Sequence, residues 1–445
     1  MGPFRRLGRT DVVRSTAEAR AGRHGQPGHG RWTLALPILR SRRRRGQAMT
    51  RIREVTCVHL RFPCDPATTF QTPAGPVHAR FCTLVRIRTD DGLEGVGSAY
   101  AHPGVVQACI DHMGPMLIGV RADPIPAILE RLHIVSRWYG RKGAALAAIS
   151  GIDTALWDLK GKREGQPLWR LLGGTRDRAP AYASGNLYSS PEAVAAGAAR
   201  SIARGFRRVK MRVGWNYAYD VAAMRAARAA IGDEHDLMVD GTGRFTPETA
   251  AALAPVLGEV RAFWFEEPFG ADELDAFVDL RARLAPLGVP LATGENEFAF
   301  HGFRELIRAG AVDIVQADAS RAGGVSEVMR IGQLAAAHGI GLAPHTWCDI
   351  VAVTANAHVV AASPNGVTCE VDQTGNRFIE ELGGPLRLED GQLVLGERPG
   401  LGVDLDEDLV SELSVDPHRM PDGNYCDVIM GRGQTAYIGD YAAGA

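Results

Sequence analysis

The sequence predicts an α/β protein in which a closed barrel follows a smaller α+β segment. From about residue 180 onward, short apolar runs alternate strictly with helical patterns, which is typical of a parallel sheet. Eight such runs and seven helical stretches fit into about 190 residues. An open sheet of that size usually carries a glycine-rich nucleotide loop, and no GxGxxG follows an early strand.

Composition is that of a globular protein, with 445 residues, 45% hydrophobic and 23% charged. The formal net charge of −1 argues against a nucleic-acid partner, because such proteins usually carry a basic excess. No run of about 18 apolar residues occurs, so we expect neither a transmembrane helix nor a membrane partner. The seven cysteines form no CxxC pair, which favours a reducing, cytoplasmic location.

The first 48 residues differ from the rest of the chain. They are rich in Arg and Gly and have no apolar periodicity, so we expect a basic, disordered leader over 1–48. A transit peptide or a basic nucleic-acid arm is an alternative. We favour an upstream extension with a misassigned start, because regular structure is predicted directly after Met49.

The next segment predicts an α+β domain over 49–170. Runs rich in Val, Leu and Ile indicate strands at 51–62 and 80–90, and Asp-Gly in TDDGLEGVG predicts a hairpin into a further strand. Helical patterns follow at 105–119, 124–137 and 143–165, the last of them rich in alanine.

The barrel is predicted over 171–385. Its strands are expected at 180–184, 206–213, 236–240, 262–266, 289–293, 312–317, 340–344 and 367–371. Its helices are expected at 192–203, 219–231, 246–258, 272–286, 301–310, 324–338 and 350–362. Short strands and turns return in 386–445, and we expect this segment to complete the first domain.

Charged residues end seven successive predicted strands, which is where barrel enzymes carry their active residues. These are Lys210 and Arg212, Asp240, Glu266 and Glu267, Glu295 and Glu297, Asp318, His345, and Glu370 and Asp372. Solvated loops alone do not readily explain such a series.

Three of these acids come from adjacent strands: Asp240, Glu266 and Glu295. Hard oxygen ligands without Cys or His suit Mg²⁺. Lys210 and Arg212 share one strand face, and a buried cation needs an anionic partner, which predicts an anionic substrate. The choice of Glu266 over Glu267 rests on one-residue alternation. A helix cap is the alternative role for Glu267, and a loop charge is the alternative role for Glu297.

Over 51–405 the chain resembles the enolase superfamily, specifically its mandelate racemase-like group of acid-sugar dehydratases. The motifs are KMR, VDG, FEEP, TGEN, QADASRAGG, APH and CEVD, with ISGIDTALWDLKGKREGQPLWRLLGG upstream. The resemblance implies a modified (β/α)7β TIM-type barrel with an α+β N-terminal capping domain. It also implies a homo-oligomer, either an octamer or a dimer.

The resemblance implies roles for the site residues. The Mg²⁺ ligands would be Asp240, Glu266 and Glu295, and the substrate's carboxylate would chelate the metal. His345, paired with Asp318, would act on the α-carbon through an enediolate. Glu370 would hydrogen-bond the substrate carboxylate, and Lys210 would be its electrostatic partner.

Position 212 departs from the group, which commonly has Lys-x-Lys on this strand. Arginine is a poor proton acceptor, so a two-base racemase is disfavoured. We expect His345 to remove the α-proton and to protonate the departing β-hydroxyl, giving a 2-keto-3-deoxy acid. An epimerase or cycloisomerase of the same superfamily is the main alternative. A metal-dependent aldolase or hydrolase and a non-enzymatic scaffold are further alternatives.

Two loops are candidates for reading the sugar hydroxyls, 64–76 and 98–104. Their candidate residues are Phe70, Gln71, Tyr100 and His102. The stretch RWYGRKG, with Trp138, Tyr139, Arg141 and Lys142, either reaches the pocket or forms a charged turn. Thr346 and Trp347 are expected to line the floor of the pocket.

Overall fold

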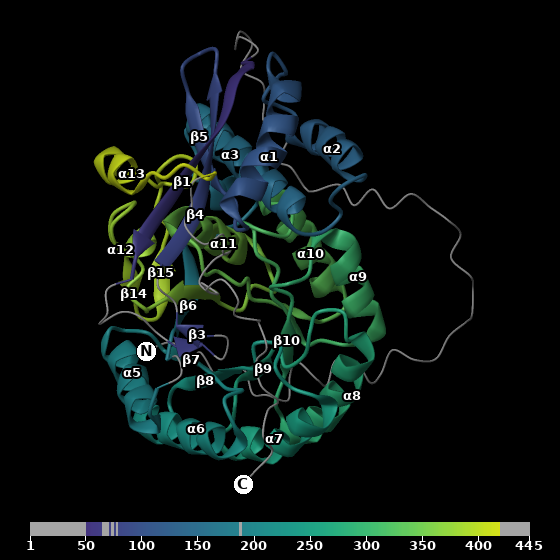
Figure 1. Ribbon diagram of the computed structural model, residues 1–445, viewed down its shortest axis with the longest axis vertical. Coiled ribbons are helices and arrows are strands. Elements are labelled where there is room, and N and C mark those ends of the chain that lie inside the picture. Colours follow the sequence, from purple (N-terminus) through teal and green to yellow (C-terminus); the bar gives the residue numbers. More distant parts are fainter. Residues whose placement is uncertain (1–49, 65–70, 73–74, 77–78, 187–188, 419–445) are drawn as a thin grey trace, which may run out of the picture.

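The computed structural model describes residues 50–64, 71–72, 75–76, 79–186 and 189–418. The expected leader, Phe70 and the chain after residue 418 lie outside these residues. The described residues form a barrel with a smaller cap above it (Figure 1). This confirms the predicted fold class.

The cap contains a three-stranded antiparallel sheet in the order β1 (Ile52–Pro63), β4 (Ala79–Thr89) and β5 (Glu94–Ser98). The Asp-Gly turn joins β4 to β5 as predicted, and Gly92 there has a φ of 86°. A separate short hairpin pairs β2 (Gln71–Thr72) with β3 (Gly75–Pro76).

The cap has three helices: α1 (Pro103–Met113), α2 (Ile125–Ser136) and α3 (Ala144–Glu164). Helices α1 and α3 pack on the sheet, and α2 packs on α3. Helix α3 is buried from Ala145 to Gly161, between the cap sheet and the barrel (Figure 1). Small residues allow this close packing, because a Cβ on Gly97 of β5 would lie 2.0 Å from the carbonyl oxygen of Gly151. The alanine-rich pattern thus marks the helix on which the sheet packs.

Eight parallel strands form the barrel in the described part of the chain. They are β6 (Arg178–Ser184), β7 (Arg208–Arg212), β8 (Asp236–Asp240), β9 (Trp264–Glu266), β10 (Leu291–Thr293), β11 (Ile314–Val315), β12 (Gly341–Leu342) and β13 (Cys369–Asp372). Strands β6 to β12 pair in sequence order, and β13 pairs with β6. A parallel bridge between Leu342 and Gly366 closes the ring.

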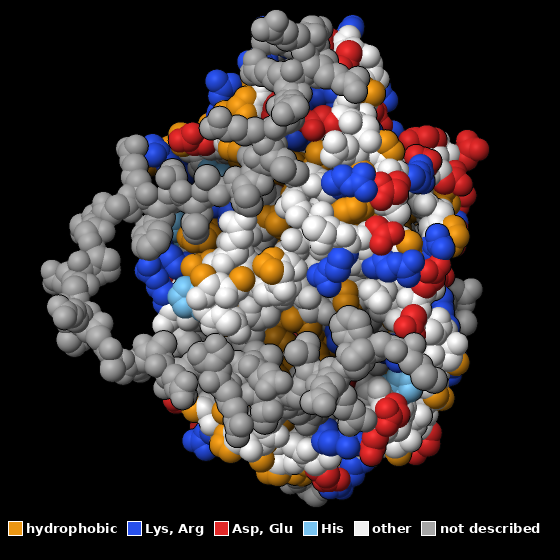
Figure 2. Space-filling view, turned by 180° about the vertical axis from the view of Figure 1, so that it is seen from behind, with side chains coloured by type: hydrophobic (Ala, Val, Ile, Leu, Met, Phe, Trp, Pro, Cys, Tyr) orange, Lys and Arg blue, Asp and Glu red, His pale blue; other side chains and the backbone are white. Residues whose placement is uncertain are grey.

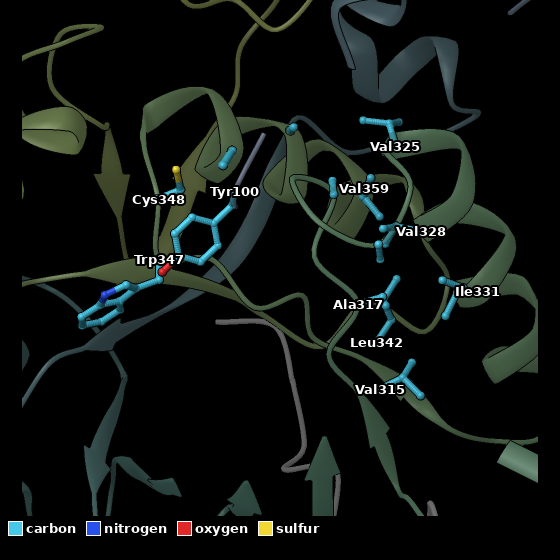
Figure 3. Packing of buried hydrophobic residues seen from close by; sticks show 14 of the residues in the cluster. Tyr100, Val315, Ala317, Val325, Val328, Ile331, Leu342, Trp347, Cys348 and Val359 are labelled. Carbon is cyan, nitrogen blue, oxygen red and sulfur yellow. The ribbon is translucent and has the colours of Figure 1, made fainter. Parts of the chain in front are cut away.

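Seven helices connect these strands within the described residues, as the sequence predicts. They are α5 (Pro191–Ala203), α6 (Tyr217–Ile231), α7 (Pro247–Glu259), α8 (Leu274–Leu284), α9 (Ala299–Ala309), α10 (Val325–Ala337) and α11 (Ile350–Ala362). Figure 3 shows side chains of α10, including Val328 and Ile331, packed toward Val315 and Leu342 of the barrel strands. Short helices α4 (Leu168–Leu171) and α12 (Arg377–Glu380) precede and follow the barrel.

The C-terminal segment contacts both units. The hairpin of β14 (Leu388–Glu389) and β15 (Gln392–Val394) pairs antiparallel with the start of β6. Helix α13 (Glu407–Leu413) packs on β1, and Ser414 forms a bridge with Leu60 of that strand.

The face in Figure 2 carries Lys and Arg side chains interspersed with Asp and Glu side chains, most densely along its right-hand side. This mixed surface agrees with a net charge close to zero. Among the described residues, no helix combines the length and the apolar character needed to span a bilayer.

Candidate active site

Three carboxylates converge at the carboxyl ends of neighbouring barrel strands. Asp240 ends β8, Glu266 ends β9 in register with it, and Glu295 lies two residues beyond β10. One oxygen from each lies within 4.8 Å of the others. Ligand oxygens of an octahedral Mg²⁺ lie about 3 Å apart when adjacent, given bonds of about 2.1 Å. A small inward movement would therefore let these three acids hold Mg²⁺.

Lys210 of β7 points into the barrel, where it meets acids from three strands. Its Nζ lies 2.6 Å from Glu266 Oε1, 2.9 Å from Glu370 Oε1 and 3.2 Å from Asp240 Oδ2. Burial lowers the pKa of Lys210, but Glu266 and Glu370 raise it by more, so the net shift is well above its usual value. The inward-facing side of this strand is thus the charged one.

The site keeps an excess of negative charge around Lys210. Burial raises the pKa of Glu266 to about 7 although Lys210 opposes the shift. A divalent cation would remove this penalty, since buried charges require compensation. The excess negative charge and the carboxylate oxygens of the cluster both fit a hard divalent cation.

Arg212 lies at the rim of the carboxylate cluster. Its Nε is 3.6 Å from Asp240 Oδ2, and its guanidinium stacks 4.4 Å from the ring centroid of Trp347. Arg80 of the cap strand β4 stacks on the same ring at 4.8 Å and forms an ion pair with Asp372 of β13. Trp347, expected to line the floor of the pocket, therefore lies between Arg212 of the barrel and Arg80 of the cap and holds Arg212 next to the cap.

His345 and Asp318 form the expected pair. His345 Nδ1 lies 2.9 Å from Asp318 Oδ2, while Ser320 donates to the other carboxylate oxygen through its N–H and hydroxyl. This bond assigns the proton to Nδ1 and leaves Nε2 directed at Glu295, 3.7 Å away. Burial lowers the pKa of His345, but the Glu295 charge and the Asp318 bond raise it to about 9.

Glu370 lies on β13 beside the His345–Asp318 pair, which is called the dyad from here on. Its Oε2 accepts a 2.8 Å hydrogen bond from the backbone N–H of Thr346, and its Oε1 faces Lys210. Burial raises the pKa of Glu370, but Lys210 and His345 lower it to about 2 overall. Glu370 is therefore an anion at neutral pH.

The neighbouring acids have other partners. Glu267 has a φ of 34°, accepts two 3.1 Å hydrogen bonds from Asn296 and lies next to Glu295, whereas the three converging carboxylates are those of Asp240, Glu266 and Glu295. Glu297 forms a 3.0 Å ion pair with Lys142. The grouping of Glu266 with Asp240 and Glu295 agrees with the alternation argument, and the role of Glu266 as a metal ligand stays a prediction.

The candidate sugar-reading residues differ in position. Tyr100 stacks on the His345 ring with centroids 6.2 Å apart, and its N–H donates to the Ser320 carbonyl. His102 caps α1 by accepting from Gly104 N–H. In RWYGRKG, Lys142 reaches Glu297 while Trp138 is 81% exposed. No side-chain position is described for Gln71.

Sequence reasoning assigned no role to two residues that support the site. Arg321 donates from Nε to the Glu295 carbonyl and stacks on Tyr100 at 5.2 Å. Arg321 lies in the motif QADASRAGG, so the sequence predicts that it follows a barrel strand but does not predict its contacts with Glu295 and Tyr100. Asn356 of α11 hydrogen-bonds both Asp318 and the His345 carbonyl, and its signal was a polar residue in an apolar helix.

Comparisons with known proteins agree with this architecture. Residues 52–173 match the family described as mandelate racemase / muconate lactonizing enzyme, N-terminal domain, and residues 193–409 match enolase C-terminal domain-like. Arabinonate dehydratase of Saccharolobus solfataricus is 33% identical, over 75% of this chain and 91% of that protein. D-galactarolactone cycloisomerase of Agrobacterium fabrum is also 33% identical, over 80% and 96%.

A solved structure extends this similarity. L-talarate/galactarate dehydratase from Salmonella typhimurium LT2, liganded with Mg and L-lyxarohydroxamate, superposes with a TM-score of 0.76 at 30% identity. The match covers 90% of this chain and 98% of that one.

Proposed function

The chain belongs to the enolase superfamily, in its mandelate racemase-like group, and from this premise we propose that it is a Mg²⁺-dependent dehydratase of sugar acids. The observation that carries the proposal is the His345–Asp318 dyad, directed at the carboxylate cluster while arginine occupies position 212. Relatives and solved neighbours named as acid-sugar dehydratases support it.

The residues divide the chemistry as follows. Asp240, Glu266 and Glu295 would hold the metal, because their carboxylate oxygens lie within 4.8 Å of one another. When bound, Mg²⁺ supplies the positive charge that stabilises the enediolate and offsets the negative charge of Glu295. Lys210 and Arg212 add fixed positive charge next to the substrate carboxylate.

His345 moves the proton. In the neutral form of His345, Nε2 accepts the α-proton, and the C–H electron pair forms the enediolate. The resulting imidazolium gives that proton to the β-hydroxyl, the C–O bond breaks, and water leaves. The enol then tautomerises to the 2-keto-3-deoxy acid. Asp318 stabilises the imidazolium throughout, because its Oδ2 faces Nδ1–H at 2.9 Å.

A cycloisomerase or epimerase acting on a sugar acid or lactone is the second candidate. D-galactarolactone cycloisomerase, at the same 33% identity as the arabinonate dehydratase, favours it. Both reactions begin with loss of the α-proton, but only dehydration releases water and leaves a 2-keto acid.

We extend the proposal to the setting of the enzyme. A cytoplasmic location is supported by the cysteines of the described part, which are free thiols. Assembly as a homo-oligomer, an octamer or a dimer, rests on the family resemblance. The division into a cap (49–170) and a barrel (171–385) is supported by the element order. For the segment 386–445, the packing of α13 on β1 supports its assignment to the cap, whereas the β14–β15 hairpin pairs with β6 of the barrel.

The test is a plate assay on the purified full chain. Mg²⁺ and a library of mono- and dicarboxylic sugar acids are added, and 2-keto acids are detected with semicarbazide. We expect at least one positive well and loss of its signal by about 10²–10⁴-fold in His345→Asn. If every well is blank while NMR in D₂O shows deuterium at an α-carbon, the proposal of a dehydratase is wrong and that of a cycloisomerase or epimerase takes its place.

A further inference from the structure

Asn356 lies in an unusual place for a carboxamide. Helix α11 is buried from Ile350 to Ala361, and the relative exposure of Asn356 is 0%. Its neighbours along the helix are mostly Val and Ala. A buried amide without partners would cost stability, so its hydrogen bonds explain why it can be tolerated here.

The carboxamide joins the ends of two barrel strands. Its Nδ2 lies 3.1 Å from Asp318 Oδ1, 3.1 Å from the His345 carbonyl oxygen and 2.9 Å from Thr346 Oγ1. Its Oδ1 accepts a 3.0 Å bond from Ala319 N–H. One rigid group therefore contacts the backbone or side chain of both members of the dyad.

This geometry fixes the relative position of acid and base. Asp318 Oδ1 is occupied by Asn356 and Ser320, which leaves Oδ2 for His345 Nδ1. The bond to the His345 carbonyl holds the loop after β12 at the same time. Thr346 N–H in turn donates to Glu370, so the arrangement extends to β13.

We propose that Asn356 is a positioning residue for the reaction, which holds Asp318 and His345 in register for proton transfer. The kinetic part of this inference rests on the proposed function. The structural part does not, because the hydrogen bond between His345 and Asp318 can be observed without any substrate.

His358 supplies a matched control on the same helix. It is equally buried, and both ring nitrogens are paired, but with Trp169 N–H and the Leu401 carbonyl, away from the dyad. A purely structural role for buried polar groups of α11 would make the two residues equivalent.

The experiment compares Asn356→Ala, Asn356→Asp and His358→Ala in the full chain. For Asn356→Ala we expect kcat to fall by about 10–100-fold, with KM and the Kd for Mg²⁺ changed by less than about threefold. The low-field ¹H NMR signal of the His345 Nδ1 proton should be lost or broadened. His358→Ala should lower the melting temperature but keep kcat and that signal.

The outcomes separate the two claims. An unchanged kcat and an intact low-field signal in Asn356→Ala would overturn the positioning role. If Asn356→Ala does not fold, Asn356→Asp removes the amide donors with little change of shape and is judged by the same readouts. If no sugar acid reacts with the unmodified enzyme, the proposed function fails, while the NMR comparison still decides the role of Asn356.

Discussion

Single buried charges set the properties of this site. Lys210 is 1% exposed and touches carboxylates from three different strands, so its ammonium group links Asp240, Glu266 and Glu370. Removing one partner of such a cluster leaves a buried charge without compensation, which is costly. The effect of a substitution in this cluster therefore includes the change in buried net charge as well as the loss of the individual hydrogen bond or ion pair.

Glu266→Gln should weaken Mg²⁺ binding by at least about tenfold, because an amide oxygen replaces a charged ligand between Asp240 and Glu295. Isothermal titration calorimetry measures the change. Glu259→Gln is the control, since Glu259 is exposed and pairs with Arg225 on the barrel surface. Equal affinity in Glu266→Gln and the unmodified protein would refute the metal assignment.

Arg212→Lys should introduce a second proton acceptor beside the substrate. Lysine can lose its proton when desolvated, whereas the guanidinium cannot. We expect weak epimerisation of the substrate in D₂O, visible by NMR as deuterium incorporated at an inverted α-carbon. A variant that dehydrates normally but yields no epimer would show that the identity of residue 212 does not restrict the enzyme to one face.

At the scale of one element, α11 combines a buried apolar surface with polar groups that each have defined partners. Its N-cap Asp349 accepts from Val351 and Ala352 and from the Ser98 hydroxyl of the cap. The helix therefore links the dyad, the cap and the C-terminal segment, and its stability should depend on pH through His358.

Burial lowers the pKa of His358 to about 4 from an ordinary value near 6.5. The unfolded chain thus binds a proton in this interval and the folded chain does not. The free energy of unfolding should fall as pH drops from 6.5 toward 4, by up to about 1.4 kcal/mol per pH unit. Urea unfolding at pH 7 and pH 5 should show a smaller drop for His358→Gln than for the unmodified protein. Parallel drops would contradict the assignment.

The sequence predicts elements and strand ends better than it predicts contacts between them. Alternating apolar runs located every barrel strand, and their ends located Asp240, Glu266 and His345, because strand direction fixes where side chains emerge. The role of Asn356 could not be predicted, since it depends on how α11 is rotated about its axis. Strands β11 and β12 are shorter than expected, although Gln316 and Ala343 continue their backbone hydrogen bonds.

At the scale of the whole molecule, a buried polar seam joins the cap to the barrel. Asp153 of α3 accepts two 2.7 Å bonds from the N–H and hydroxyl of Ser326 at the start of α10. Trp157 of α3 donates to the same hydroxyl. Because Tyr100 of the cap stacks on His345 of the barrel, the seam also fixes the geometry of the site.

Asp153→Ala should lower stability by about 2–4 kcal/mol, because two buried donors of Ser326 lose their acceptor and a cavity remains. Thermal unfolding measures the loss, with Asp279→Ala on the exposed face of α8 as the control. A melting temperature as high as that of the control would show that the seam is held by apolar packing alone.

The contacts of α13 and Ser414 with β1 have a consequence for synthesis on the ribosome. The cap strands emerge first, yet their last covering segment is translated only after the entire barrel. A nascent chain therefore carries an incompletely covered cap for most of its translation. Protection of that surface during elongation, by a chaperone or by slow folding of the cap, is a requirement set by chain connectivity itself.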